Sequence, residues 1–180
     1  HHGVLEMHLV EVVLAGKVND RLDGQAWRVL KVDQQLAGAK VPVSRGAAGA
    51  AEQDYIVRFV REAAVGQPWL LYLPFNAPHA PYEAKEEDLQ KYPLLTGDRR
   101  TYAAMVDSMD QAIGRILVAV EARTDAANTL VLFFSDNGGI LNVGSSNGPY
   151  RGAKLTVYEG GTRVCAAMRW PVRSNSSMVG

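Results

Sequence analysis

The sequence has one cysteine, no net charge and no long apolar run. Cys165 alone can form neither an internal disulfide nor a metal site built from several cysteines. Lysine plus arginine and aspartate plus glutamate each number 19, so the formal net charge is zero. No overall field therefore attracts nucleic acid or an anionic membrane surface, and we expect no nucleic-acid partner. No apolar run approaches the roughly 20 residues that span a bilayer, so no membrane span is expected.

The chain also lacks a convincing signal peptide. The nearest candidate, VLEMHLVEVVLAG, is interrupted by Glu6, His8 and Glu11 and has no cationic leader. Hydrophobic residues make up 47% of the 180 residues, which is enough to bury a core, so residues 1–180 are most simply one globular unit. Because the sequence starts at His1 without a methionine and stops at SNSSMVG, both ends are expected to be cut.

Hydrophobic periodicity predicts an α/β fold with at least partly parallel strands. Two helices are expected, one at 51–64 that Gly66 can end and a longer one at 98–123. Continuous apolar runs predict three buried strands, at 68–75, 129–134 and 163–170. The longer helix carries one apolar stripe, made by Tyr102, Met105, Val106, Met109, Ile113, Ile116, Leu117 and Val120.

Residues 1–50 give mixed signals. A strand or a helix is possible at 4–14, and the Gly/Ala-rich stretch AGAKVPVSRGAAGAA favours a surface connection. No further structure is assigned to this part of the chain.

Polar residues follow two of the predicted strands, where ligands sit in open α/β sheets. Asp136 and Asn137 follow the strand at 129–134, and the loop NAPHAP (76–81) follows the strand at 68–75. Carboxylate and amide oxygens suit Ca²⁺ or Mg²⁺, and the two glycines after Asn137 let the backbone turn around a small ion. The same Asp-Asn-Gly-Gly run is also a common turn, and that interpretation stays open.

Two further residues could handle an anion. His79, between Pro78 and Pro81, could donate to an oxyanion or protonate a leaving oxygen. Lys154, in the glycine-rich stretch GPYRGAKLTVYEGG, could neutralise a bound oxyanion. A loop histidine without a role and a merely solvated lysine are the simpler alternatives. We expect the loops holding His79, Asp136 and Asn137, and Lys154 to converge at one edge of a shared sheet.

The order and wording of these segments resemble the sulfatase (arylsulfatase-like) family of the alkaline-phosphatase superfamily. The resemblance covers residues 51–173 and lies in LYLPFNAPHAPYEA, RRTYAAMVDSMDQAIGRIL, NTLVLFFSDNGG, SSNGPYRGAKLTVYEGGTRV and, after Cys165, AAMRWP. It implies an alkaline-phosphatase-like sandwich with a largely parallel or mixed central sheet flanked by helices. The chain is then expected to be the middle portion of a sulfatase catalytic domain, with residues 1–50 poorly defined.

The resemblance also implies roles for the candidate residues. Asp136 and Asn137 would ligate Ca²⁺, with Mg²⁺ less expected, His79 would contact the sulfate or its leaving oxygen, and Lys154 would bind sulfate oxygens. The implied activity is hydrolysis of a small or carbohydrate sulfate ester, and the implied location is periplasmic or secreted. Nothing in the sequence indicates an oligomeric state.

The chain departs from the family at the nucleophile and around Lys154. Family members carry an upstream Cys-x-Pro-x-Arg or Ser-x-Pro-x-Arg, whose first residue becomes formylglycine, and an upstream acidic pair. Neither is here, since VPVSR has Val41 at the nucleophile position. Gly152, Ala153, Lys154 and Leu155 stand where the family has Gly-Gly-Lys-Gly. This chain alone is therefore expected to be inactive, and two alternatives stay open: a phosphonate or phosphate ester hydrolase of the same superfamily, or a catalytically silent fragment or pseudoenzyme.

Overall fold

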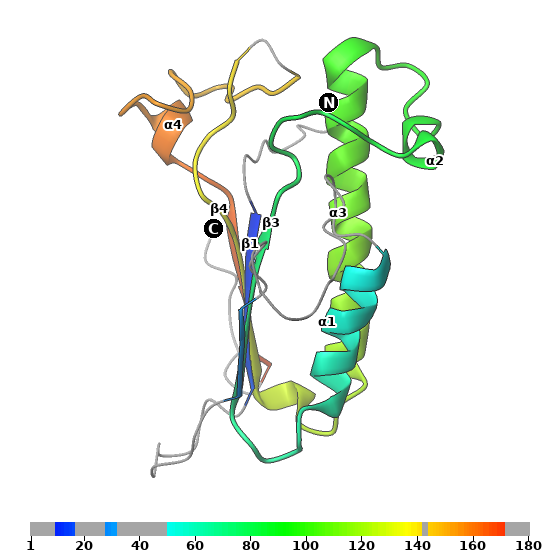
Figure 1. Ribbon diagram of the computed structural model, residues 1–180. Helices are drawn as coiled ribbons and strands as arrows, with labels where there is room; N and C mark the ends of the chain where they lie inside the picture. The colour runs from blue at the N-terminus through cyan, green and yellow to red at the C-terminus, as the bar shows by residue number, and fades with distance from the viewer. Residues whose placement is uncertain (1–9, 17–27, 32–49, 142–143, 172–180) are drawn as a thin grey trace.

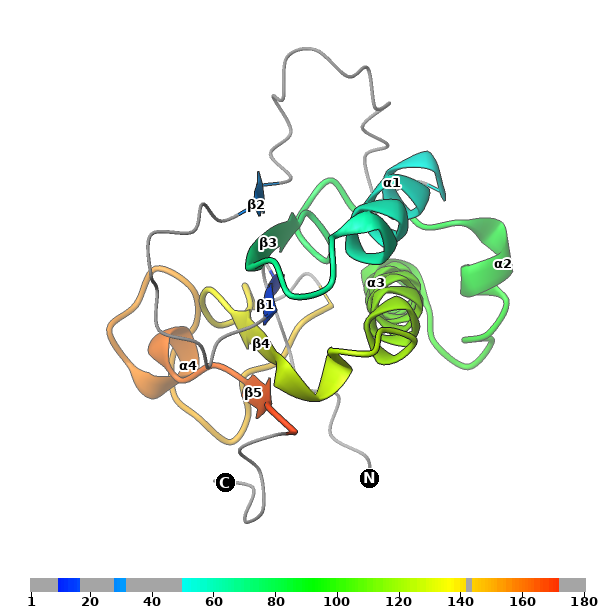
Figure 2. The same cartoon turned by 90° about the horizontal axis from the view of Figure 1, so that it is seen from below.

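The described part of the chain is built around a mixed sheet. The computed structural model describes residues 10–16, 28–31, 50–141 and 144–171. Within these residues five strands lie in the order β2-β3-β1-β4-β5. Figure 1 labels β1, β3 and β4, and Figure 2 labels all five. The strands are β1 (Val10–Gly16), β2 (Arg28–Lys31), β3 (Trp69–Phe75), β4 (Thr129–Ser135) and β5 (Ala166–Arg169). The helices are α1 (Ala50–Glu62), α2 (Glu86–Leu89), α3 (Gly97–Glu121), the 3-10 turn η1 (Ala126–Asn128) and α4 (Glu159–Thr162).

The central strand β1 determines which strand ends lie together. It pairs antiparallel with both β3 and β4, and Val10 lies between Phe75 and Ser135 in the register. Two strands that are each antiparallel to a third run in the same direction, so β3 and β4 end at the same edge of the sheet. Only the β2–β3 pair is itself parallel among the described strands. The sheet is therefore mixed, as one of the two expected forms, and the long helix α3 carries the chain from β3 back to the start of β4.

Helices α1 and α3 cover one face of this sheet (Figure 2). The apolar residues of α3 expected to form a stripe are buried or packed against the core, and on β3 the alternate residues Trp69, Leu71, Leu73 and Phe75 are buried beneath the helices. Phe59 of α1 meets Trp69 edge-on, with ring centroids 6.4 Å apart. Burial of aliphatic and aromatic side chains of this size contributes about 1.5–3 kcal/mol each. No helix among the described residues is long and apolar enough to cross a membrane.

Three strand expectations need correction. The runs at 68–75 and 129–134 form strands, but β3 alternates between buried and half-buried residues and β4 has half-buried positions as well, so neither is buried on both faces. The run at 163–170 forms strand only at Ala166–Arg169, and all four residues are exposed. This strand is exposed because it lies at the edge of the sheet, paired with β4 alone among the described strands. An apolar run predicts burial poorly in an edge strand, because such a strand has a neighbouring strand on one side only.

The amino-terminal part also differs from expectation. Within the possible element at 4–14, residues 10–14 belong to β1, while residues 4–9 lie outside the described residues. Of the stretch 37–51, expected to be a surface connection, residues 37–49 also lie outside them, and Ala50 and Ala51 instead begin α1. The helix expected at 51–64 ends at Glu62, and Gly66 takes a positive φ of 84° in the turn that follows. A strand with only a mixed sequence signal is thus the centre of the sheet, and β2 (Arg28–Lys31) was not expected at all.

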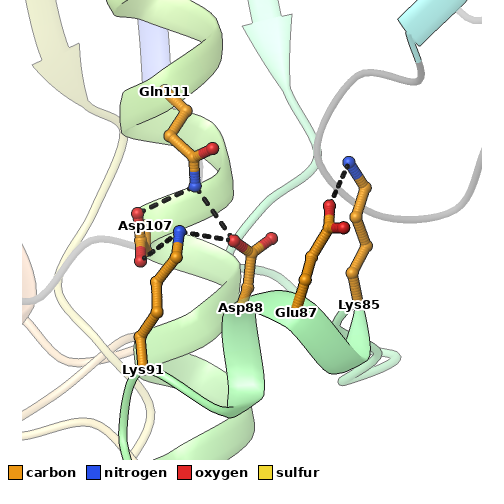
Figure 3. A network of polar contacts seen from close by, with 6 residues as sticks. All are labelled: Lys85, Glu87, Asp88, Lys91, Asp107 and Gln111. Carbon is orange, nitrogen blue, oxygen red and sulfur yellow. Dashed lines mark hydrogen bonds and ion pairs between the residues drawn. The ribbon is translucent and has the colours of Figure 1, made fainter.

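A polar network fastens α2 to α3 and closes the segment that follows β3 (Figure 3). The carboxylate of Asp88, only 2% exposed, accepts hydrogen bonds from Lys91 Nζ at 2.8 Å and Gln111 Nε2 at 3.0 Å. Lys91 Nζ also lies 3.1 Å from Asp107 Oδ2, so one ammonium bridges two carboxylates. Because β3 holds the amino-terminal end of the segment 76–85, the network fixes the carboxy-terminal end of that segment.

The pairing controls the protonation of Asp88. Burial alone raises the pKa of the carboxyl group, but hydrogen bonds from Lys91 and Gln111 and the charges of Lys91 and Lys85 outweigh it. The net result is a pKa below the ordinary aspartate value of 3.8. A lowered pKa means that the charged form is the one that stabilises the fold.

We expect Asp88→Asn to lower the free energy of unfolding by about 1–2 kcal/mol at pH 7, because the charge-assisted bond from Lys91 is lost. For a chain of this size that corresponds to a melting temperature lower by roughly 2–8 °C. The matched control is Glu87→Gln on the same helix, whose partner Lys85 lies 3.6 Å away in an exposed pair. Thermal unfolding followed by circular dichroism should show almost no shift for the control. Equal shifts for both variants would contradict the role of the network.

The stabilising effect of Asp88 should also depend on pH. The folded-state pKa is lowered, so its contribution is present above the unfolded-state value and is lost as pH falls through the folded-state value. The difference in melting temperature between wild type and Asp88→Asn should therefore shrink when the pH is taken from 7 to about 3. A difference that grows on acidification would show that the pKa is raised instead.

Candidate functional site

Three loops meet at the edge where β3 and β4 end, as expected from the sequence. They are the segment 76–85 after β3, the segment 136–141 after β4 and the segment 144–158 before α4 (Figure 1). The last of these and α4 lie on the side of the sheet away from α1 and α3 (Figure 2). Their meeting follows from the register, because Phe75 and Ser135 flank the same residue of β1.

The first loop places His79 at this edge. Ala77 and Pro78 are buried and anchor the loop, and the His79 backbone N–H donates to Asn76 O at 2.8 Å. The ring is half-buried, and its Nδ1 lies 2.9 Å from Ala80 O. Because a carbonyl oxygen can only accept, Nδ1 carries the proton of this bond. In the neutral ring Nε2 then carries a lone pair and can accept a hydrogen bond. In the protonated ring Nε2 carries a proton and can donate one.

The second loop begins with Asp136 and Asn137, directly after the last residue of β4. The buried hydroxyl of Ser135 donates to Asn137 O at 3.0 Å and so fixes the turn. Asp136 is exposed, whereas Oδ1 of Asn137 is a buried oxygen with no hydrogen-bond partner among the residues that the structure describes. A buried acceptor without a donor is costly unless something else satisfies it, and a cation does so. Asn128 Oδ1 is buried and unpartnered among the described residues in the same way, so this feature is compatible with a cation at Asn137 but does not by itself distinguish a metal site from a turn.

The two glycines after Asn137 are needed because other parts of the chain pass very close to them, a backbone at Gly138 and the Ser145 side chain at Gly139. A Cβ built on Gly138 would lie 1.8 Å from Gly160 O, and one on Gly139 would lie 2.5 Å from Ser145 Oγ. Gly138 N–H donates to Gly161 O at 3.1 Å, which ties the Asp136 loop to α4. Any side chain at these two positions would push the loops apart.

The third loop carries Lys154 in a tight turn. Thr156 N–H donates to Ala153 O at 3.0 Å, so residues 153–156 form a β-turn with Leu155 at its third position. Leu155 has a φ of 73°, the left-handed region that a glycine adopts without strain and a leucine only at a cost of about 1–3 kcal/mol. The side chain is 93% exposed and avoids any clash. The departure from the family's glycine therefore leaves the turn intact.

The side chains of the first and third loops meet. Lys154 Nζ lies 3.5 Å from His79 Nε2, across 75 positions of sequence, and both side chains are half-buried. Lys154 N–H also donates to Gly139 O at 3.1 Å, so the lysine turn rests on the backbone that follows Asn137. An oxyanion between the two side chains would accept from the ammonium and, when the ring is protonated, from Nε2–H.

One residue of this site was missed by the sequence reasoning. The side-chain amide of Asn147 accepts from Gly139 N–H at 2.8 Å and donates to Gly139 O at 2.8 Å and Gly152 O at 3.3 Å. It therefore joins the second loop to the third. The signal that could have found it is the Asn-Gly-Pro run at 147–149, which reads as a turn and hides the role of the side chain.

The remaining candidates are a metal-binding cluster and Cys165. Within the described part of the chain no group of three or more His, Cys, Asp and Glu residues comes together that could hold a metal ion. Cys165 lies just before β5, half-buried against the core, and burial raises the pKa of its thiol. It behaves as a small apolar residue.

Known proteins similar to this chain include proteins named as sulfatases. Arylsulfatase J of Mus musculus is 34% identical over 114 residues, which cover 63% of this chain and 19% of that protein. N-acetylgalactosamine-6-sulfatase of Homo sapiens is 38% identical over 118 residues, which cover 63% of this chain and 22% of that protein. The solved structure of Ps i-CgsB in complex with k-i-k-neocarrahexaose matches with a TM-score of 0.60 at 37% identity, covering 67% of this chain and 28% of that one.

The chain thus spans about a fifth of the length of these curated relatives. The structural match confirms the expected sulfatase fold, with its mixed sheet and flanking helices. The family model described as Sulfatase matches residues 39–176, which is well over half of the sequence. The chain therefore belongs to the sulfatase family.

Proposed function

We propose that the protein containing this chain hydrolyses sulfate esters, and that this chain supplies its anion-binding and part of its metal-binding residues. The observation that carries the proposal is the meeting of His79 Nε2 and Lys154 Nζ, 3.5 Å apart, at the same sheet edge as Asp136 and Asn137. These residues come from three separate loops, so a single local turn motif does not account for their meeting.

The residues have complementary tasks in this proposal. The ammonium of Lys154 is a point charge that offsets the negative charge of the sulfuryl oxygens. His79, with Nδ1 held by Ala80 O, directs Nε2 toward the same place and can give a proton to a leaving oxygen. Both side chains are half-buried, and partial exclusion of water strengthens their interaction with an anion.

Asp136 and Asn137 would hold a Ca²⁺ ion in this proposal, with Mg²⁺ less favoured. The support is Oδ1 of Asn137, which is buried and has no partner within the described part of the chain, and the carboxylate of the preceding residue, Asp136. When bound, such an ion supplies positive charge that polarises a sulfuryl oxygen. Ca²⁺ takes 6–8 oxygens, so a complete site needs ligands in addition to this pair.

The substrate class in this proposal is a sulfated carbohydrate. The support is the naming of the relatives, one after an N-acetylgalactosamine sulfate and one solved with a neocarrahexaose. Phosphate and phosphonate esters have the same tetrahedral anion, but no residue of the described site favours them. An assay of the intact protein on paired aryl sulfate and aryl phosphate esters separates the two, and preferential cleavage of the phosphate would refute the proposal.

The 180-residue chain alone should not turn over an aryl sulfate, even with Ca²⁺ supplied. No Cys-x-Pro-x-Arg or Ser-x-Pro-x-Arg occurs in it, and loss of a nucleophile typically lowers the rate on the order of 10⁶-fold. Release of the chromogenic phenol over hours checks this. Hydrolysis that disappears in His79→Ala would show that a nucleophile lies within these residues.

In the intact protein, His79→Ala and Lys154→Ala should each lower kcat/KM for an aryl sulfate by about 10²-fold or more, because each removes charge stabilisation at the reacting group. The matched control is Lys85→Ala, a loop lysine whose charge is paired with Glu87 in the solvent. It should retain nearly full activity. If His79→Ala and Lys154→Ala are as active as this control, the proposed site is wrong.

The chain alone should bind Ca²⁺ weakly, with a dissociation constant around millimolar, because Asp136 and Asn137 provide only two of the required ligands. Calorimetric titration of wild type, Asp136→Ala and the exposed-helix control Asp110→Ala measures this. The weak binding should be lost in Asp136→Ala and kept in Asp110→Ala. Micromolar binding that Asp136→Ala abolishes would show that the metal site is complete within this chain.

A further inference from the structure

We propose that Asn147 is a positioning residue for sulfate ester hydrolysis, whose side-chain amide sets the place of Lys154 relative to Asp136 and Asn137. The inference rests on the proposed function of the same site. Asn147 itself contacts neither of the two anion-binding side chains among its hydrogen bonds. Its effect on the reaction would therefore pass through the backbone that it holds.

The side-chain amide of Asn147 pairs with the backbone of Gly139 as a residue of a neighbouring β-strand would. Its Oδ1 accepts from Gly139 N–H at 2.8 Å and its Nδ2 donates to Gly139 O at 2.8 Å, so both polar groups of one peptide residue are satisfied by one side chain. A flat, two-ended amide can do this, whereas an ionised aspartate lacks the donor, alanine lacks both groups, and serine has a single oxygen for both tasks. Gly139 is itself buried, so leaving these groups unpaired would be costly.

The same amide reaches the lysine turn. Nδ2 also donates to Gly152 O at 3.3 Å, two residues before Lys154, and Gly139 O accepts from Lys154 N–H at 3.1 Å as well. Gly139 O is therefore shared between the side chain of Asn147 and the backbone of Lys154. Moving one donor changes the place of the other, because both are directed to one oxygen.

Other contacts between these loops act at a different place. Gly138 N–H bonds Gly161 O, and Gly160 N–H bonds Arg151 O, so they fix α4 and the end of the third loop. The turn that carries Lys154 is held to the Asp136 loop through Gly139 O, where Asn147 acts. A displacement of about 1 Å in a catalytic side chain can cost on the order of 10²-fold in rate, so this hold is relevant to the reaction.

The test uses the intact protein with Asn147→Ala and Asn147→Asp. The aspartate keeps the size and one acceptor but directs a second acceptor at Gly139 O and Gly152 O, so it tests the donor even if the alanine variant fails to fold. The matched control is Asn128→Ala, a half-buried asparagine at the opposite end of β4. We expect kcat/KM for an aryl sulfate to fall about 10- to 100-fold in both Asn147 variants and to change little in the control.

A double-mutant cycle separates positioning from general destabilisation. If Asn147 acts through Lys154, Asn147→Ala should lower activity no more than about twofold further in a Lys154→Ala background. Asn128→Ala should have the same small effect in both backgrounds. A full 10-fold or larger additional loss for Asn147→Ala in the Lys154→Ala background would overturn the proposal.

A second readout does not depend on activity. Hydrogen exchange of the Lys154 amide should become at least about 10-fold faster in Asn147→Ala and stay unchanged in Asn128→Ala, because the first variant loosens the acceptor of that amide. Unchanged exchange in Asn147→Ala would overturn the positioning role. A wild-type protein that cleaves no sulfate ester would instead refute the proposed function, and the exchange experiment would still decide whether Asn147 holds Lys154.

Discussion

The antiparallel pairing of β1 with both β3 and β4 is the constraint on which the rest of the structure depends. It makes β3 and β4 run in the same direction, with Phe75 and Ser135 on either side of Val10. The loops that follow them must then leave from one edge, and the long helix α3 returns the chain between them across the helix-covered face. Had β1 been absent from between them or parallel to one of them, the loops of His79 and Asp136 would not share an edge by necessity.

Close approach of three loops is possible because small residues and one amide replace side-chain packing there. Gly138 and Gly139 leave no room for a Cβ, and Asn147 satisfies the backbone groups that this close contact would otherwise leave unpaired. The polar network of Asp88 with α3 holds the far end of the His79 segment from the other side. The proposed anion-binding pair and the proposed metal ligands therefore rest on backbone that is fixed by hydrogen bonds, which is the preorganisation that electrostatic catalysis requires.

The elements with strong local patterns could be predicted from the sequence. The apolar stripe of α3 and the apolar runs of β3 and β4 give helix and strand within one or two residues, since each is long enough for its period to show. Burial was harder to predict. Residues 163–170 have the composition of a core strand, yet β5 is exposed because its place at the sheet edge is a property of the whole fold. The central strand β1 was also hard to predict, because the sequence there was compatible with either a strand or a helix.

The sequence by itself determined the family-like motifs and the candidate residues His79, Asp136, Asn137 and Lys154, because their chemistry and their place after apolar runs are local properties. Only the tertiary structure decided that Lys154 Nζ meets His79 Nε2 across 75 positions, and that the Asn147 side chain bonds both the N–H and the carbonyl oxygen of Gly139. The physical reason is that such contacts depend on strand order and backbone approach. Neither leaves a periodic trace in the sequence, and a side-chain amide in a turn motif looks the same whether it faces solvent or a backbone.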